Sequence, residues 1–275
     1  MLSINTNMGA LNASQSSYSA NKSMEASMAR LSSGKRINSG ADDAAGLFIT
    51  KRMATEIQGL NQAVRNASDA QAFLQTAEGA LEEVHTILLR IRELAVQSSN
   101  GTYTTQDRVA LQAEVTDLQS EINRIATDTT FNNIGALSGA ASTGITFQIG
   151  ADNTQTMTVS VSRSTISAMG INISTAIQVL SAGGAMNYIS TIDSAISIVS
   201  TDRGTYAAAI NRLDHAIANM QNVATNLSMA KGRIEDADFA AETSNLARVQ
   251  VLQQASMAML AQANASKQNI LSLFQ

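Results

Sequence analysis

The 275-residue chain contains no proline, no cysteine and no tryptophan, and only 4% of its residues are aromatic. Average usage of about 5% would give roughly a dozen prolines in a chain of this length. Because proline is the residue that most reliably breaks a helix, its absence allows helices to run without interruption. Without cysteine there is no disulfide framework, no thiolate metal site and no cysteine nucleophile.

Concentrated charge and long apolar runs are also lacking. The formal net charge is −4, from 18 basic and 22 acidic residues, and no basic face of the kind that neutralises phosphates is visible, so we expect no nucleic-acid partner. The N-terminus has no Lys or Arg before Lys22 and no continuous apolar run, which argues against a cleavable signal peptide. Residues 164–192 are uncharged but rich in Ser, Thr, Gly and Asn, so no membrane insertion is expected. We therefore expect a cytosolic chain, unless it is exported by a route that uses no standard signal.

What the chain does contain is a long amphipathic pattern between residues 43 and 99. Apolar residues recur there at alternating steps of three and four with one break, which predicts a heptad helix roughly 80 Å long. A small globule cannot cover such a length, so partners along the helix are expected. The apolar positions are Met53, Ile57, Leu60, Val64, Ala67, Ala70, Leu74, Ala77, Leu81, Val84, Leu88, Ile91 and Ala95.

Further elements follow in order along the chain. Asn100-Gly101-Thr102 ends the long helix, and Thr105 with Asp107 opens a second one, with apolar positions from Val109 to Ile125, that folds back against the first. Period-two alternation predicts a β-hairpin over about 144–162. Helix returns near Asn187, and a second apolar stripe over 192–227 matches the first in register, so the two stripes should pair. The expected fold class is mainly α: an elongated antiparallel helical bundle or coiled coil formed by pairing of the N- and C-terminal regions, with a small β-hairpin region.

The terminal segments carry a weaker apolar pattern. They consist mostly of Ala, Ser, Gln, Asn and Met around a few Leu and Ile, which is too little for a stable isolated pair of helices. We therefore expect these segments to be disordered in the free monomer and to fold on assembly.

Candidate chemical sites have simpler structural interpretations. The only two histidines, His85 and His215, lie within heptad helices and are interpreted as structural rather than as metal ligands or a proton relay. The sequence contains no P-loop, GxGxxG or GxSxG motif. We expect no cofactor, no metal and no enzymatic activity. Two acidic groups are predicted to cap helices, and the second does not have EF-hand spacing: Asp42 with Asp43, and Glu235 with Asp236 and Asp238.

Several ordered motifs at both ends of the chain resemble the bacterial flagellins. They are RLSSGKRINSGADDAAGLFI at 30–49, QTAEGAL at 75–81, RIRELAVQ at 90–97, ADFAAET at 237–243 and QQASMAMLAQAN at 253–264. The resemblance implies a secreted, extracellular subunit of the flagellar filament that serves motility. It also implies export of the unfolded chain through the flagellar type III apparatus, an export chaperone, and polymerisation with cap and hook-junction proteins as partners.

The resemblance further implies a domain organisation. Residues 1–43 and 231–275 would form the inner core of a homopolymeric helical filament, and residues 44–186 with 187–230 a surrounding wall that carries the hairpin. Only about 25 residues separate Val161 from the returning helix, so no large outer variable domain is expected. Lys35 stands where many members carry an apolar residue. The assembly core is expected to include Leu11, Leu31, Leu252, Met259, Ile270 and Leu273.

The motif at 90–97 resembles that of flagellins detected by the vertebrate Toll-like receptor 5. It implies a receptor contact through Arg90, Leu94 and Glu114, and the alternative interpretation gives these residues a role in lateral packing of subunits. Two alternatives to a filament subunit stay open at this point. One is a hook–filament junction protein, which would not polymerise by itself, and the other is an enzyme or a cytosolic coiled-coil scaffold.

Overall fold

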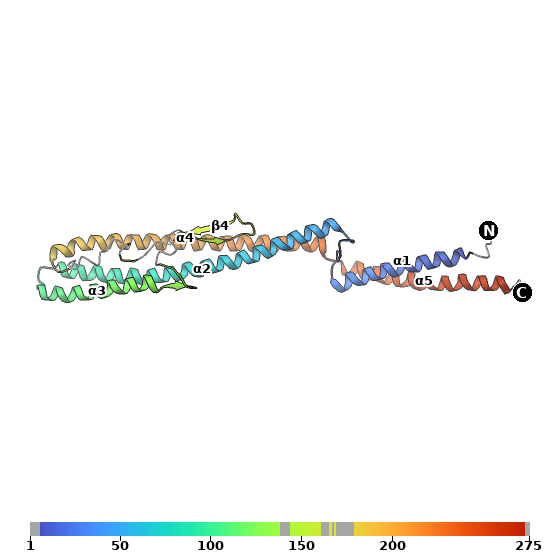
Figure 1. The fold of residues 1–275 in the computed structure, drawn as a ribbon, viewed down its shortest axis with the longest axis horizontal. Helices are drawn as coiled ribbons and strands as arrows, with labels where there is room; N and C mark the ends of the chain where they lie inside the picture. The colour runs from blue at the N-terminus through green and yellow to red at the C-terminus, as the bar shows by residue number, and fades with distance from the viewer. Residues whose placement is uncertain (1–5, 138–143, 161–164, 167, 169–178, 273–275) are drawn as a thin grey trace. The chain divides into compact units, whose positions relative to one another are not determined.

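The computed structural model describes residues 6–272 except 138–143, 161–164, 167 and 169–178. The described residues form helices α1 (Met8–Ser33), α2 (Ala44–Ser99), α3 (Thr105–Asp128), α4 (Ala182–Glu235) and α5 (Phe239–Ser272) and four short strands (Figure 1). The chain divides into a terminal unit, residues 1–57 with 225–275, and a second unit, residues 58–224. Mainly helical secondary structure and pairing of the N- and C-terminal regions were both predicted, and both are confirmed.

In the terminal unit, α1 and α5 run antiparallel, side by side (Figure 1). Asn7 caps α1 by accepting a hydrogen bond from the Ala10 amide at 3.1 Å, and its own amide nitrogen donates to the Ala263 carbonyl at 3.1 Å. Further along, Gln253 Nε2 donates to Asn21 Oδ1 at 2.6 Å. The helix α1 ends at Gly34, whose φ of 71° is the left-handed conformation that glycine adopts most easily.

In the second unit, polar side chains define how α2 pairs with α4. Gln71 Nε2 donates to Asp214 Oδ1 at 2.6 Å, and Arg92 Nε donates to Asp193 Oδ1 at 2.6 Å. From the first pair to the second, the residue number rises by 21 on α2 and falls by 21 on α4. Arg203 lies between them and pairs with Glu78, at 2.8 Å, and with Glu82. The predicted pairing of the two apolar stripes is therefore confirmed, in a constant antiparallel register.

The core of the second unit follows the predicted heptad positions. From Leu60 to Ala95 nearly every predicted position on α2 is buried, whereas Met53, Ile57 and Val64 are half-buried. Helix α3 adds Val115, Ile122 and Ala126. Helix α4 contributes Ala185, Tyr188, Ile192, Ala195, Val199, Tyr206, Ala209, Leu213 and Met220.

Helix α3 differs from its prediction at the first turn. Thr104, one residue before the predicted start, is the N-cap and forms a reciprocal capping box with Asp107. Val109, predicted to lie in the apolar stripe, is 54% exposed, and Arg108 is buried instead. The Arg108 guanidinium donates to the backbone carbonyls of Asn100, at 3.0 Å, and Tyr103, at 3.4 Å. This arginine therefore closes the turn between α2 and α3, and the prediction for Val109 was wrong.

The predicted hairpin is confirmed as β3 (Ile145–Gln148) and β4 (Thr156–Val159), an antiparallel pair in which Phe147 lies opposite Met157. Val161, assigned to the same alternation, lies outside the described residues. A second antiparallel pair, β1 (Thr130–Phe131) with β2 (Ile134–Gly135), was not predicted. Its turn is Asn132-Asn133, with φ of 49° and 62°, as a two-residue turn of the hairpin-compatible type requires.

One aromatic side chain of α2 contacts both strand pairs. The Phe73 ring lies 6.0 Å from the ring of Phe131 in β1, edge to face, and 6.2 Å from that of Phe147 in β3. Phe73 is 3% exposed. Because two-stranded sheets are marginal by themselves, this contact anchors both of them to the helices.

One helix boundary differs from the sequence-based one. Helix α4 begins at Ala182 rather than near Asn187, because the Ser181 hydroxyl accepts the Gly184 amide at 3.1 Å and caps a glycine-containing first turn. The units divide at 57/58 and 224/225, inside continuous helices, and the predicted division of the chain into filament core and wall at 43/44 and 230/231 stays a prediction. The helix breaks at 34–43 and 236–238 bond to each other, so both belong to the terminal unit together with the adjoining turns of α2 and α4.

Replacing Phe73 by alanine should lower the free energy of unfolding by about 3–5 kcal/mol, as for other buried aromatic residues, because both hairpins lose their anchor. Chemical denaturation of the monomer followed by circular dichroism measures the change. Phe48→Ala is the matched control, since Phe48 lies on the same helix and is 70% exposed, and its effect should stay within about 0.5 kcal/mol. Equal losses for the two variants would contradict the anchor.

Candidate functional site

The helix α1 buries small residues and exposes large ones. Its buried side chains are those of Ala13, Ser17, Ala20 and Ser27. Four of its six large apolar residues, Met8, Leu11, Tyr18 and Met28, are more than half exposed, and the other two, Met24 and Leu31, are half-buried. In an ordinary surface helix the large apolar side chains face the core. Here most of them face away from the partner helix within the chain.

Helix α5 likewise leaves apolar side chains exposed, and it does so on more than one of its sides. Among its residues with described side chains, no apolar side chain is buried. Its only charged residues are Glu242, Arg248 and Lys267. A helix that is apolar all round is normally buried. Large apolar residues that are more than half exposed on α5 are Phe239, Val251, Leu252, Met257 and Met259.

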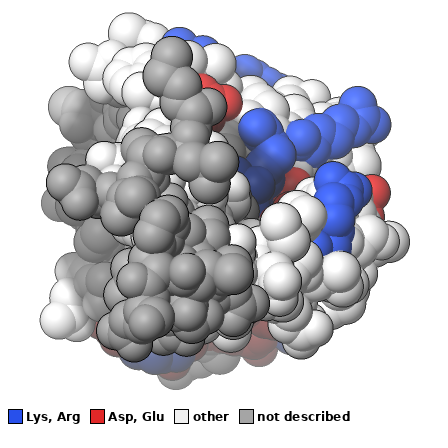
Figure 2. Space-filling view, turned by 90° about the vertical axis from the view of Figure 1, so that its right-hand side faces the viewer, with Lys and Arg blue, Asp and Glu red and all other residues white. Residues whose placement is uncertain are grey.

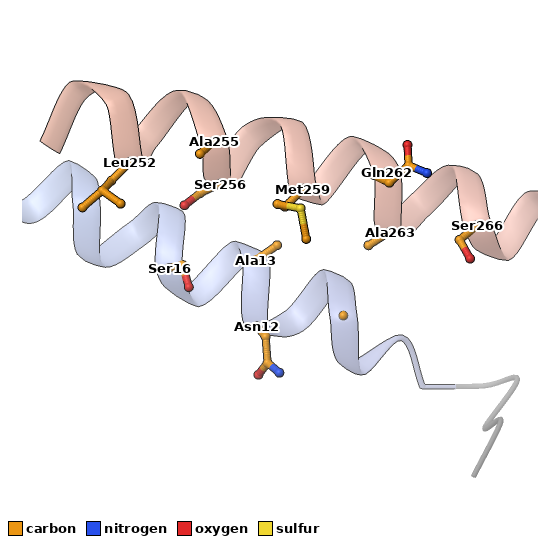
Figure 3. Close-up of a pocket in the computed structure, with 11 residues that line it drawn as sticks. Asn12, Ala13, Ser16, Leu252, Ala255, Ser256, Met259, Gln262, Ala263 and Ser266 are labelled. Atoms are coloured by element: carbon orange, nitrogen blue, oxygen red, sulfur yellow. The ribbon is translucent and has the colours of Figure 1, made fainter. Parts of the chain in front are cut away.

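A groove of about 550 Å³ lies between α1 and α5. Small residues dominate its lining, with Leu252 and Met259 as the large apolar members. Figure 3 shows Ala13 of α1 and Met259 of α5 pointing into the space between the helices, whereas Asn12 points away from α5. Among the described residues of the face drawn in Figure 2, most are uncharged, and Lys and Arg side chains gather in one part of it. This groove offers apolar surface and no convergent set of charged groups for chemistry.

The predicted assembly residues fall mainly on this exposed surface. Leu11, Leu252 and Met259 are exposed, and Leu31 is half-buried. The Ile270 side chain and the whole of Leu273 lie outside the described residues. The role of all six in assembly stays a prediction, and for the three exposed residues the single chain leaves the side chains available.

At the C-terminal end of α1, the segment between α1 and α2 is hydrogen-bonded to the segment between α4 and α5. We call this pair of segments the clasp and define it as residues 34–37 with 234–237. The Arg36 amide donates to the Glu235 carbonyl at 2.7 Å, and the Ala237 amide to the Gly34 carbonyl at 3.0 Å. Lys35 Nζ lies 2.7 Å from Glu235 Oε1, and Lys231 Nζ lies 3.4 Å from Glu235 Oε2. Lys35 therefore supplies an ion pair to the clasp.

The electrostatics of the clasp follow from this geometry. Glu235 is buried, which by itself would raise the pKa of its carboxyl group. The hydrogen bond from Lys35 has the larger effect, and with the charges of Lys231 and Lys35 it lowers the pKa of Glu235. The same hydrogen bond raises the pKa of Lys35.

Of the acidic residues predicted to cap helices, Asp43 and Asp238 do so, whereas Glu235 belongs to the clasp. Asp43 Oδ1 accepts the Gly46 amide at 2.8 Å at the start of α2, and Asp238 Oδ1 accepts the Ala240 amide at 2.9 Å at the start of α5. Asp42 instead closes the preceding turn, and its bonds to the backbone and side chain of Ser39 lower its pKa. Within the part of the chain that the structure describes, no group of three or more His, Asp or Glu residues could hold a metal ion. No helix among the described residues is both long and apolar enough to cross a membrane.

The three residues assigned to receptor contact are not all on the surface. Arg90 Nε and Nη2 lie 3.0 and 2.9 Å from Glu114 Oε1, and both side chains are substantially exposed. Leu94 is 1% exposed, because it lies with Ile91 and Ala95 on the heptad face that packs in the core of the second unit. The structure therefore pairs Arg90 with Glu114 at the surface, whereas Leu94 is buried in the core.

Sequence reasoning missed two features of this site. The ion pair of Lys35 with Glu235 joins residues 200 positions apart, and no local pattern reports such a pairing. The burial of small residues and exposure of large ones on α1 could have been predicted, because the small residues recur at helical spacing between the large ones.

The chain is similar in sequence to known bacterial proteins. The bacterial flagellin N-terminal helical region matches residues 4–142, and the bacterial flagellin C-terminal helical region matches residues 189–274. A flagellin of Halalkalibacterium halodurans is 42% identical over 273 residues, covering 99% of each chain. The flagellar filament core protein flaB2 of Brachyspira hyodysenteriae is 40% identical over 283 residues, also covering 99% of each chain. The crystal structure of Bacillus cereus flagellin is 32% identical, covers 61% of this chain and 94% of its own, and has a TM-score of 0.49.

Paired terminal helices that leave their large apolar side chains exposed define a helical structural protein of the self-associating class. With family matches at both ends and relatives aligned over nearly the whole length, the chain belongs to the bacterial flagellin family.

The clasp should make the terminal unit acid-sensitive. Because the pKa of Glu235 is lowered in the folded state, its contribution to stability is present above the unfolded value near 4.5 and is lost as pH falls through the folded value. The pKa of Lys35 is raised, so its contribution is present below 10.5 and is lost as pH rises through the folded value.

Hydrogen exchange of the Arg36 and Ala237 amides measures the clasp directly, at a pH above 4.5 and at pH values below it. Glu235→Gln should weaken protection of these amides at neutral pH and reduce the loss on acidification. Glu25→Gln, at an exposed position on α1, is the control and should leave the acid response of the clasp unchanged. An acid response that is the same in Glu235→Gln and in the parent chain would contradict the assignment.

Proposed function

We propose that this chain is the structural subunit of an extracellular flagellar filament and that it assembles through α1 and α5. The observation that carries the proposal is that no apolar side chain of α5 is buried among those the structure describes, and that five large ones, Phe239, Val251, Leu252, Met257 and Met259, are more than half exposed. Each exposed Leu or Met that becomes buried against a neighbouring copy would contribute roughly 1.5–3 kcal/mol. The relative from Brachyspira hyodysenteriae is named as a filament core protein, which supports the same function here.

The arrangement of the exposed residues favours an open polymer. Large apolar residues lie on the outer face of α1 as well as around α5, so the surface offered to a neighbour differs from one side of the helix pair to another. Contacts between unlike surfaces do not close on themselves, and when the rotation does not close a ring they generate a helical filament. Any number of copies can then add through the same contact.

We also propose that the chain leaves the cell unfolded through the flagellar type III apparatus. The absence of cysteine supports this, because an unfolded chain without thiols cannot be cross-linked in transit. Before α1 and α5 pair, the terminal segments of the unfolded chain would be accessible to an export chaperone. Cap and hook-junction proteins are the further partners proposed at the growing end and the base of the filament.

Electron microscopy of purified monomer after addition of a kosmotropic salt tests self-assembly, since such salts strengthen burial of apolar surface. Long uniform filaments are the expected result. Met259→Lys should prevent them, because Met259 is 64% exposed on α5 and the substitution places a charge in the apolar contact. The matched control is Met186→Lys, at a position 67% exposed on α4.

Three results would count against the proposal. Filaments formed by Met259→Lys would exclude α5 as the contact. Monomer that persists in salt and adds only to hook ends would favour a junction protein. Monomer that adds to nothing would favour a scaffold or an enzyme.

A second proposed function is recognition by Toll-like receptor 5 through the exposed pair of Arg90 and Glu114. Arg90→Ala should weaken receptor signalling by the monomer while its unfolding is unchanged, because the lost ion pair is exposed. Arg124→Ala, which removes a comparable exposed pair with Glu121 on α3, is the control. Leu94→Ala should instead lower the free energy of unfolding by about 2–5 kcal/mol. Signalling by Arg90→Ala equal to that of the parent chain would refute the receptor contact.

A further inference from the structure

The turn between α2 and α3 contains the only Asn-Gly pair in the sequence, Asn100-Gly101. Both residues are exposed. An asparagine side chain can be attacked by the backbone nitrogen of the residue that follows it. Glycine in that position favours the attack, because it has no side chain to shield the nitrogen and its backbone reaches conformations that other residues avoid.

The hydrogen bonds of this turn leave the reacting atoms free. The Asn100 carbonyl accepts the Arg108 guanidinium at 3.0 Å and the Tyr103 amide at 3.4 Å, and Asn100 Oδ1 accepts the Thr102 amide at 3.3 Å. Within the described residues, neither the Gly101 amide nor Asn100 Nδ2 takes part in a hydrogen bond. The hydrogen bond from the Thr102 amide keeps the Asn100 carboxamide beside the backbone that follows it.

A second asparagine followed by a small residue shows the opposite situation. At Asn38-Ser39 the Asn38 side-chain nitrogen donates to the Ala29 carbonyl at 3.2 Å, and the Ser39 amide donates to Asp42 Oδ2 at 2.9 Å. The leaving group and the attacking nitrogen are therefore both engaged. Folding should protect this site and not the one at Asn100.

We propose that Asn100-Gly101 is a site of spontaneous deamidation in the folded chain. The Gly101 backbone nitrogen loses its proton to solvent and bonds to Asn100 Cγ. The bond from Cγ to Nδ2 breaks, and the nitrogen takes up protons from solvent and leaves as ammonia. Water then opens the cyclic imide at either carbonyl, which gives an aspartyl or an isoaspartyl residue. No oxidant or cofactor takes part.

The product alters the contacts that close the turn. An isoaspartyl linkage adds a methylene group to the main chain and shifts the carbonyl that now accepts Arg108 and Tyr103. Arg108 is buried, and its Nη1 has no hydrogen-bond partner among the described residues, so loss of the Asn100 carbonyl would leave it still less satisfied. Deamidation should therefore loosen the end of the second unit, independently of whether the chain polymerises.

The test is incubation of the purified full-length chain at neutral and mildly basic pH, followed by peptide mapping with mass spectrometry. We expect the peptide containing Asn100 to gain one mass unit, to separate into two isomers, and to react faster as the pH rises. The peptide containing Asn38 should stay unchanged. In guanidinium chloride the Asn38 peptide should react too, so the ratio of the two rates should fall on unfolding.

Gly101→Ala is the matched variant, because a Cβ at this position would meet no atom within 4 Å and the φ of Gly101 is not in the left-handed region. It should fold as the parent chain does and react severalfold more slowly at Asn100. The proposal is overturned if Asn100 gains no mass, if Asn38 reacts as fast in the folded chain, or if Gly101→Ala reacts at the parent rate while its circular dichroism spectrum is unchanged.

Discussion

Antiparallel pairing of the first half of the chain with the second is the constraint on which the rest of the structure depends. In the second unit this pairing buries almost the whole heptad face of α2 from Leu60 to Ala95 against α4 and α3. In the terminal unit the same kind of pairing buries only the small residues of α1 and no large apolar side chain of α5. One unit is therefore stabilised within a single chain, and the other retains apolar surface that only further copies could cover.

Repetitive apolar stripes do not by themselves fix how two helices are aligned. The stripes of α2 and α4 are built largely from Ala, Leu, Ile and Val, so a shift of one heptad would still bring apolar residues together. Polar partners make such a shift unfavourable: Gln71 with Asp214 and Arg92 with Asp193 keep the same offset along both helices. Exposed ion pairs contribute little stability, but several at one offset discriminate against the shifted registers. In the terminal unit Gln253 with Asn21 and the clasp of Lys35 with Glu235 act in the same way.

Most of the helical organisation could be predicted from the sequence, because heptad periodicity reports local structure and one buried face at once. The same reasoning failed where a single residue departs from its usual place. Val109 lies on the predicted stripe, but the true stripe of α3 passes through Arg108, whose buried guanidinium bonds the turn. Leu94 was assigned to a surface by resemblance, although its place beside Ile91 and Ala95 in the heptad already indicated burial. The hairpin of β1 and β2 is too short to show an alternating pattern, and only the asparagine pair in its turn indicates it.

The small residues of α1 have a consequence for how the terminal unit gains stability. Ala13, Ser17, Ala20 and Ser27 let α1 and α5 lie side by side, but they bury too little apolar area to offset the entropy of ordering two long helices. Larger residues on this face would stabilise the pair in the single chain and would widen the distance between the helices. Because small residues face inside and Leu11, Tyr18 and Met28 lie outside, the largest apolar side chains of α1 can be buried only against other chains. The main stabilising contacts of α1 are therefore contacts between chains. Stability of this unit should then depend on the concentration of chains, as it does for any folded state that is completed by association.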